Sequence, residues 1–459
     1  MLFSSIPFVF YFLPAVLALY FAVPFRFKNA VLLVFSLVFY GWGEPVYLLL
    51  MALSILMGWG LGLLMERFPR KKRLLLILSA IISLGLLGWF KYAGFAAATL
   101  NALGLSLPVP QVSLPIGISF YTFQILSYTI DVYRGDVAAQ RSIVDFGAYV
   151  SMFPQLIAGP IVRYSDVARQ LEHREHSLQK ASLGVRRLLL GLGKKILLAN
   201  QLGQLTQLYR ESSQQSVLFV WMYAVAFALQ IYFDFSGYSD MAIGLGRIFG
   251  FDLLENFDYP FLSRSASEFW RRWHMSLGTW FRDYVYIPLG GSRVRPGRYL
   301  LNVLIVWALT GLWHGAAWNF VLWGLLFALL LTVEKFWLGK PMARLPGWLV
   351  RPPVLAVLLM SFVLFNAASL PQAWSDLRGM VGCGLPLSSQ ESLYYLRSYG
   401  PLLAVSVLGA TPVVKNAAKR LERTRLGPVL EPVLLCALLL AVTAFLVAGS
   451  YNPFLYFRF

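Results

Sequence analysis

A long apolar run with a single histidine in it is the feature that most constrains this chain. Residues 299–333 contain no Asp, Glu, Lys or Arg, and His314 is the only histidine among them. Arg298 precedes the run and Glu334 follows it. A helix needs about 20 apolar residues to cross a bilayer, or about 17 at the short end. The run therefore predicts two short membrane passes joined by a turn.

The turn of this hairpin is expected at the sequence Gly-Leu-Trp-His-Gly. Gly311, Gly315 and Asn319 interrupt the apolar pattern there. This position places His314 at or inside the far end of a membrane hairpin, beside Trp313. An ionisable group at such a depth is costly, so it indicates function by default. The alternative is a neutral histidine that is hydrogen-bonded to a neighbouring helix.

The composition is that of an integral membrane protein. Hydrophobic residues make up 58% of the 459 residues and charged residues 13%, whereas a soluble domain has about 25% charged residues. The mean hydropathy is +0.65. The polar stretches are too short for a separate soluble domain, so we expect one membrane domain over residues 1–459. The two cysteines lie far apart, and neither a disulfide framework nor a metal site is indicated.

The net charge of +18 comes from basic residues in short loops between apolar runs. Such residues remain on the cytoplasmic side and contact anionic lipid headgroups, so they give no indication of nucleic-acid binding. On this rule His314 faces the outer half of the membrane. Five basic clusters are predicted to be cytoplasmic: Arg67–Arg73, Arg163–Lys195, Arg264–Arg298, Lys335–Arg351 and Lys415–Arg425.

A second feature is the amphipathic segment 265–285. Phe269, Trp273 and His274 fall on its apolar face at helical spacing, and Arg271 and Arg272 fall on the opposite face. This pattern predicts one helix that lies in the membrane interface. His274 would then point towards the protein or lipid, either as a second site residue or as a packed histidine.

The other titratable residues gave weaker indications. His173 and His176 lie in a charged segment and are expected to be exposed. Asp131, Asp234 and Asp240 border apolar runs, where they could relay protons or pair with nearby Arg residues. A neutral histidine works as a base near neutral pH with little tuning. One buried histidine with a second available suits deprotonation of a hydroxyl that attacks an activated acyl group.

Six motifs follow one another along the chain: LPIGISFYTFQ (114–124), MFPQLIAGPIVRY (152–164), DFSGYSDMAIG (234–244), ENFDYPF (255–261), FWRRWHMSLGTWFRDYVYIPLGG (269–291) and TGLWHGAAWNFVLWG (310–324). Together they resemble the membrane-bound O-acyltransferase family. The segment YIPLGGSR (286–293) is similar to the bacterial branch of that family that acetylates exopolysaccharides such as alginate or cellulose.

The resemblance implies an all-α polytopic bundle, with short, re-entrant and in-plane helices around a central funnel or tunnel. It implies a catalytic region at about 234–335, with His314 as the catalytic histidine and His274 as a second one. Trp313, Asn319, Asp234 and Arg272 lie in the matching motifs and are expected to bind substrate.

The same resemblance implies the reaction and its partners. The expected donor is a cytoplasmic thioester, commonly acetyl coenzyme A, and no permanently bound cofactor or metal is expected. The acetyl group would pass across the bacterial inner membrane to an exopolysaccharide, through extracytoplasmic acetyltransferase partners. The basic loops would offer cationic surface to the coenzyme phosphates.

Three other functions remain open at this point. One is transfer of D-alanine from a carrier protein to teichoic acid. The others are a secondary transporter or flippase with Asp131, Asp234 and His314 as relay groups, and a scaffold in which the histidines only pack.

The basic clusters generate a topology prediction. Single cysteines placed at Arg70, Lys194, Arg295 and Lys419 should all react only with reagents that reach the cytoplasm, because the five clusters share one side. Opposite labelling of positions 70 and 419 would rule out this topology.

Overall fold

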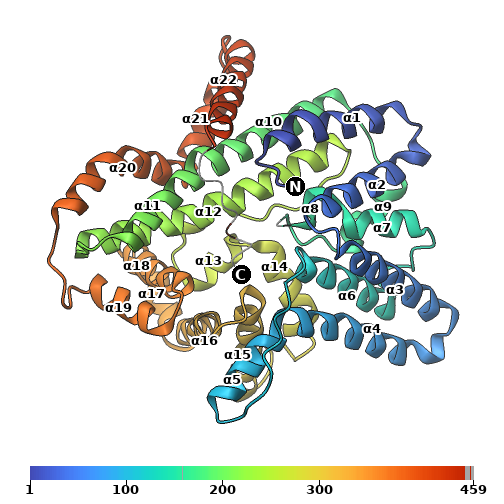
Figure 1. Ribbon diagram of the computed structural model, residues 1–459, viewed down its shortest axis with the longest axis horizontal. Coiled ribbons are helices and arrows are strands. Elements are labelled where there is room, and N and C mark those ends of the chain that lie inside the picture. The colour runs from blue at the N-terminus through green and yellow to red at the C-terminus, as the bar shows by residue number, and fades with distance from the viewer. Residues whose placement is uncertain (158, 450–454, 456–459) are drawn as a thin grey trace. The chain divides into compact units, whose positions relative to one another are not determined.

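The computed structural model describes residues 1–157, 159–449 and 455 of the chain. Within these residues the protein consists of helices and loops without a β-strand (Figure 1). The expected all-α fold class is therefore confirmed.

Seven helices in this described part are long and apolar enough to cross a membrane, which confirms a multi-pass membrane protein. An eighth span results if the pair Gln390–Gly409 and Val413–Glu422, bent by 70°, is counted as one. The seven are Phe25–Gly43, Leu48–Arg67, Pro69–Ala102, Val217–Ile248, Trp318–Arg344, Gly347–Asn366 and Gly427–Val447.

The chain folds into two compact units. The first comprises residues 1–188 and 238–254, and the second comprises residues 189–237 and 255–459. All six predicted site residues belong to the second unit. The prediction of one catalytic domain over residues 1–459 stays a prediction.

In the first unit, helix α6 packs against α3 and α4, and α7 packs against α2. Two glycines of α3 make the α3–α6 contact close: a Cβ on Gly58 would lie 2.8 Å from Ile125, and one on Gly62 would overlap the Tyr128 phenol. Small residues let membrane helices approach in this way. The unit contains α1 (Leu13–Ala22), α2 (Phe25–Gly43), α3 (Leu48–Arg67), α4 (Lys72–Leu87), α5 (Ala93–Ala102), α6 (Ile118–Arg134), α7 (Ile143–Ser151), α8 (Phe153–Leu156), α9 (Tyr164–Glu172) and most of α10 (Leu178–Gly193).

The second unit holds the site. Its long helix α12 (Val217–Ile248) contributes residues up to 237 to this unit. Helix α16 packs against α13, α15 and α18. The remaining helices are α11 (Asn200–Glu211), α13 (Ala266–Arg272), α14 (Met275–Phe281), α15 (Pro296–His314), α16 (Trp318–Val333), α17 (Gly339–Arg344), α18 (Gly347–Asn366), α19 (Leu370–Met380), α20 (Gln390–Gly409), α21 (Val413–Glu422) and α22 (Gly427–Val447).

The predicted helical hairpin is present as α15 and α16, which lie side by side and are joined by residues 315–317 (Figure 1). Helix α16 belongs to the candidate span Trp318–Arg344, whereas α15 is not among the seven candidate spans, so a membrane pass by α15 stays a prediction. Glycines bring the two helices together. A Cβ on Gly311 would overlap the carbonyl of Phe320, and a Cβ on Gly324 would overlap the carbonyl of Trp307. His314 is the last residue of α15, at the turn where it was expected.

The prediction of a single helix over 265–285 is wrong, because this segment forms two helices, α13 and α14. The prediction of which side chains are buried is correct for Phe269 and Trp273. Ser265 caps α13, as expected, by accepting a hydrogen bond from the Glu268 amide at 3.0 Å. The helix then ends at Arg272, because His274 adopts a left-handed conformation with φ 45° and ψ 52°. Helix α14 starts after this break. Phe269 and Trp273 are buried, as their places on the apolar face predicted.

The hairpin contact generates a stability prediction. Gly311→Leu should destabilise the protein by about 1–3 kcal/mol, the usual cost of overpacking, because the new side chain overlaps α16. Thermal unfolding of the detergent-solubilised protein, followed by size-exclusion chromatography, measures this effect. Gly297→Leu is the matched control, since a Cβ there meets nothing within 4 Å. Equal losses for the two variants would contradict the predicted role of Gly311.

Candidate functional site

His314 ends helix α15 inside a shell of aromatic rings. Its side chain is buried, and its ring centroid lies 5.2 Å from that of Trp323 and 5.3 Å from that of Phe365. The ring of Trp313 lies 5.0 Å away. Helices α15, α16 and α18 each contribute one or more of these rings, so the packing of the hairpin against α18 sets the position of His314.

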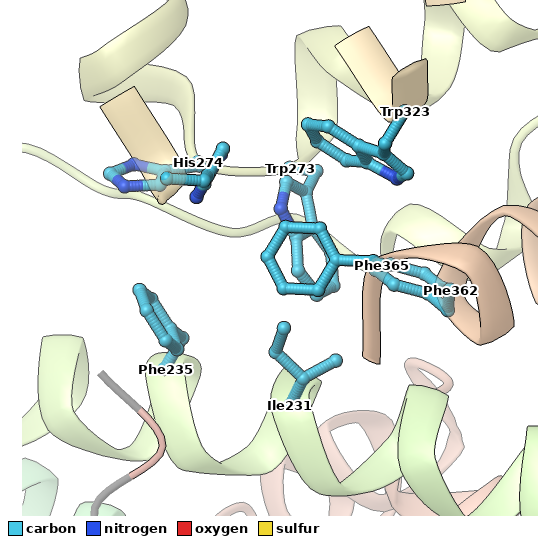
Figure 2. Close-up of a pocket in the computed structure, with 8 residues that line it drawn as sticks. Ile231, Phe235, Trp273, His274, Trp323, Phe362 and Phe365 are labelled. Atoms are coloured by element: carbon cyan, nitrogen blue, oxygen red, sulfur yellow. The ribbon is translucent and has the colours of Figure 1, made fainter. Parts of the chain in front are cut away.

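A narrow pocket joins His314 and His274. Figure 2 shows His274 and Phe235 towards one end of the lining group, with Trp323 and Phe362 towards the other. The volume is about 10 Å³, which is the space that one water molecule requires. The lining residues are Ile231, Phe235, Trp273, His274, His314, Trp323, Phe362 and Phe365.

His274 enters this pocket from the break between α13 and α14. Its ring lies 6.0 Å from Phe235 and 5.7 Å from Trp313, measured between ring centroids. Trp313 is thus the common neighbour of the two histidines. The Nδ1 atom of His274 lies 3.3 Å from Oδ1 of Asn256.

The charge state of His274 follows from its surroundings. The residue lies outside the seven candidate spans, and its side chain is enclosed by apolar groups. Burial lowers the pKa of His274 to about 3, because the imidazolium ion would lose its hydration. The imidazole is therefore neutral at physiological pH and has one nitrogen lone pair available as an acceptor.

Asn319 has a structural use in this arrangement. Its Nδ2 group donates hydrogen bonds of 3.1 Å to the carbonyls of Phe365 and Ala367. Asn319 therefore ties the start of α16 to the end of α18, next to the ring of Phe365 that contacts His314. Its predicted role in binding substrate stays a prediction, as does that of Trp313.

Asp234 is engaged in a buried ion pair. Its Oδ1 atom lies 2.6 Å from Nζ of Lys195, and both side chains are almost fully buried. Its Oδ2 atom accepts a hydrogen bond of 3.0 Å from the amide of Leu455. Arg272 lies nearer the surface and pairs with Glu268 at 2.7 Å. For both residues, a role in substrate binding stays a prediction.

Three other titratable residues of the sequence analysis lie in the first unit. His173 is exposed, as expected, but the exposure predicted for His176 is wrong. The Nε2 atom of His176 lies 2.9 Å from the Tyr20 hydroxyl and 3.2 Å from the Phe249 carbonyl. Asp240 pairs with Arg187 at 2.8 Å. This pairing is one of the two alternatives that the sequence left open for Asp240.

Sequence reasoning missed three residues that shape the site. Asn256 lies in the motif ENFDYPF, and the available signal was a polar side chain beside the aromatic residues of that motif. Lys195 was counted in the basic cluster Arg163–Lys195, which the positive-inside rule assigned to the cytoplasmic side. Phe365 carried no distinguishing pattern, since phenylalanine is frequent throughout the chain.

Comparisons with known proteins identify a family for this chain. The profile of the membrane-bound O-acyltransferase family matches residues 119–370. A probable alginate O-acetylase of Azotobacter vinelandii is 42% identical, over 84% of this chain and 79% of its own length. A probable alginate O-acetylase of Pseudomonas putida is 38% identical over the whole of both chains. A peptidoglycan O-acetyltransferase of Helicobacter pylori is 30% identical, over 100% of this chain and 98% of its own length.

The buried ion pair between Asp234 and Lys195 leads to a prediction about stability. Asp234→Asn should destabilise the protein by about 3–5 kcal/mol, because it removes the carboxylate charge that is paired with the buried Lys195 ammonium. Thermal unfolding in detergent measures the loss. Asp283→Asn is the control, because it removes a more exposed pair, Arg282–Asp283, that is worth about 0–1 kcal/mol.

A double variant separates structure from substrate binding. Asp234→Leu combined with Lys195→Met removes both charges and should recover most of the lost stability. A single variant Asp234→Asn that unfolds like the wild type but has a raised KM would instead assign Asp234 to substrate binding.

Proposed function

This chain belongs to the membrane-bound O-acyltransferase family, and from that premise we propose that it moves an acetyl group from a cytoplasmic thioester towards the hydroxyls of an exopolysaccharide. The observation that carries the proposal is the pair of buried histidines on one apolar pocket. The acyltransferase activity itself follows from the family. The acetyl group, the thioester donor and the polysaccharide are the proposed details.

The chemistry is an acyl transfer between sulfur and oxygen. The oxygen of the attacking hydroxyl forms a bond to the thioester carbonyl carbon, and the carbon–sulfur bond breaks. The hydroxyl proton leaves to a base, and the departing thiolate takes up a proton to become a thiol. We assign the base to His314, which removes or orients the hydroxyl proton, and assign support of the same cavity to His274.

The apolar walls of the pocket favour transfer over hydrolysis. Rings of Phe235, Phe362 and Phe365 line the space around the histidines. They exclude water, which would otherwise compete with the acceptor for the thioester carbon. A space of about 10 Å³ is smaller than an acetyl group requires, so side chains of the lining have to move when the donor enters.

The relatives support an acetyl group and a polysaccharide acceptor. The relatives from Azotobacter and Pseudomonas are named for alginate and the one from Helicobacter for peptidoglycan, and all three names specify O-acetyl transfer. Two of these matches extend over the whole of this chain. We include in the proposal a coenzyme A thioester on the cytoplasmic side and an extracytoplasmic acetyltransferase partner on the other side, in the bacterial inner membrane.

The histidines are tested by turnover. His314→Ala should lower the turnover of radiolabelled acetyl coenzyme A by about 10²–10⁴-fold, the usual contribution of a general base. His274→Ala should cost less, because a supporting group contributes orientation and does not take the proton. His173→Ala is the matched control, since His173 is exposed, and it should leave turnover unchanged.

All variants are compared at equal membrane abundance and with equal size-exclusion profiles. A His314→Ala variant that retains more than about a tenth of wild-type turnover would rule out the general-base role, since even a weak general base contributes more. Turnover of a D-alanyl carrier protein in place of acetyl coenzyme A would replace the proposed donor and leave the histidine roles in place.

A further inference from the structure

His274 is held in a strained backbone conformation. It is one of two residues other than glycine with positive φ in the described part of the chain, the other being Tyr259. Such a conformation costs of order 1–3 kcal/mol and persists only where its surroundings impose it. Two backbone hydrogen bonds brace the turn: Met275 N–H donates to the Asn256 carbonyl at 3.0 Å, and Asp258 N–H donates to the Arg272 carbonyl at 2.9 Å.

Asn256 also braces the turn with its side chain. Its Oδ1 atom accepts hydrogen bonds from the amide of Ser276 at 3.1 Å and from the hydroxyl of Ser276 at 3.0 Å. The same oxygen faces Nδ1 of His274 at 3.3 Å. Asn256 is almost fully buried. The single carboxamide oxygen of Asn256 therefore contacts three groups: the Nδ1 atom of His274 and the amide and hydroxyl of Ser276.

The Ser276 amide decides which way the Asn256 carboxamide points. A backbone N–H can only donate, so the atom that faces it has to be an acceptor. Turning the carboxamide over would place its NH₂ group against that N–H, and both would be buried donors. The hydroxyl of Ser276 could adapt to either orientation, but the amide could not. The oxygen therefore faces His274 as well.

This orientation fixes the tautomer of His274. Because an oxygen acceptor faces Nδ1, the neutral ring carries its proton on Nδ1 and a lone pair on Nε2. Nε2 is buried and has no hydrogen-bonding partner among the described residues. The rings of Phe235, Phe257 and Trp313 surround the imidazole. An unsatisfied buried acceptor is unusual in a folded protein, and it calls for a ligand or a role.

We propose that Asn256 is a positioning residue that holds His274 as its Nδ1–H tautomer and so reserves the Nε2 lone pair as a hydrogen-bond acceptor for the attacking hydroxyl. This inference deepens the proposed function and rests on it for the identity of the hydroxyl. The tautomer itself rests only on the contacts of Asn256. In this arrangement His274 aligns the attacking hydroxyl, and His314 removes the proton of that hydroxyl.

The tautomer is measured directly on the full-length protein. The protein is produced with ¹⁵N-labelled histidine and solubilised in detergent, and its imidazole nitrogens are observed by NMR. The His274 signals are identified by their loss in His274→Gln. We expect a protonated Nδ1 and an unprotonated Nε2. A protonated Nε2 in the wild-type protein would overturn the proposal, whatever the turnover assays show.

Two variants of Asn256 test its effect on the reaction. Asn256→Ala removes the acceptor and should lower kcat by about 10- to 100-fold, as loss of an orienting partner does elsewhere, while KM for the thioester stays within about twofold of the wild-type value. Asn256→Asp keeps an oxygen in place and should keep the Nδ1–H tautomer. Its negative charge raises the pKa of His274, so activity should be lost at a higher pH on the acid side than in the wild type.

Asn302→Ala is the matched control. Asn302 is also buried in the second unit, and its Nδ2 group donates to the carbonyl of Gly291 at 3.1 Å. Its loss should leave the His274 tautomer and the pH profile unchanged. If Asn256→Asp and Asn302→Ala show the same pH profile, Asn256 is only structural and the proposal is wrong. If the wild-type tautomer is as expected but acetyl coenzyme A is not turned over, the proposed donor fails and the assignment of Asn256 stands.

Discussion

The close contact between α15 and α16 is the constraint on which the site depends. Gly311 and Gly324 have no side chain at the point where each helix meets a backbone carbonyl of the other. The helices can therefore converge towards a turn of only a few residues. His314 is the last residue before that turn, so its ring has little freedom, and the aromatic rings of α16 and α18 occupy the space around it. Any larger residue at the contact would separate the rings that enclose the histidine.

The apolar surroundings then determine what each polar group can do. A buried polar group without a partner is costly, and a buried charge more so. Asp234 meets this requirement with Lys195 and the Leu455 amide, and Asn319 meets it with two carbonyls of the α18 end. His274 differs from them, because one of its nitrogens is satisfied and the other is not.

Much of the fold could be predicted from the sequence, because apolar runs and glycines are local signals. The hairpin at 299–333 and the place of His314 at its turn were predictable for this reason. The break at His274 was not, since helical periodicity continues through residues 265–285 on one face. A left-handed residue that is stabilised by Asn256, from a distant part of the loop, leaves no trace in that periodicity. The pairing of Lys195 with Asp234 was hidden in the same way, because the charge count of a loop does not show which lysine turns inward.

The two histidines have the same ring but are supported differently, and this difference divides their possible roles. His314 ends a regular helix, and aromatic rings set its place in the site. The proton position of His274 is also set, by the oxygen of Asn256 that faces Nδ1. Inside a water-poor pocket a hydrogen bond to a fixed lone pair is stronger than in water. Such an acceptor aligns a hydroxyl without taking its proton, since burial keeps the imidazole neutral. The strain at His274 is consistent with this use. In a relaxed helical conformation the ring would lie away from Asn256, and the proton would no longer be fixed on Nδ1.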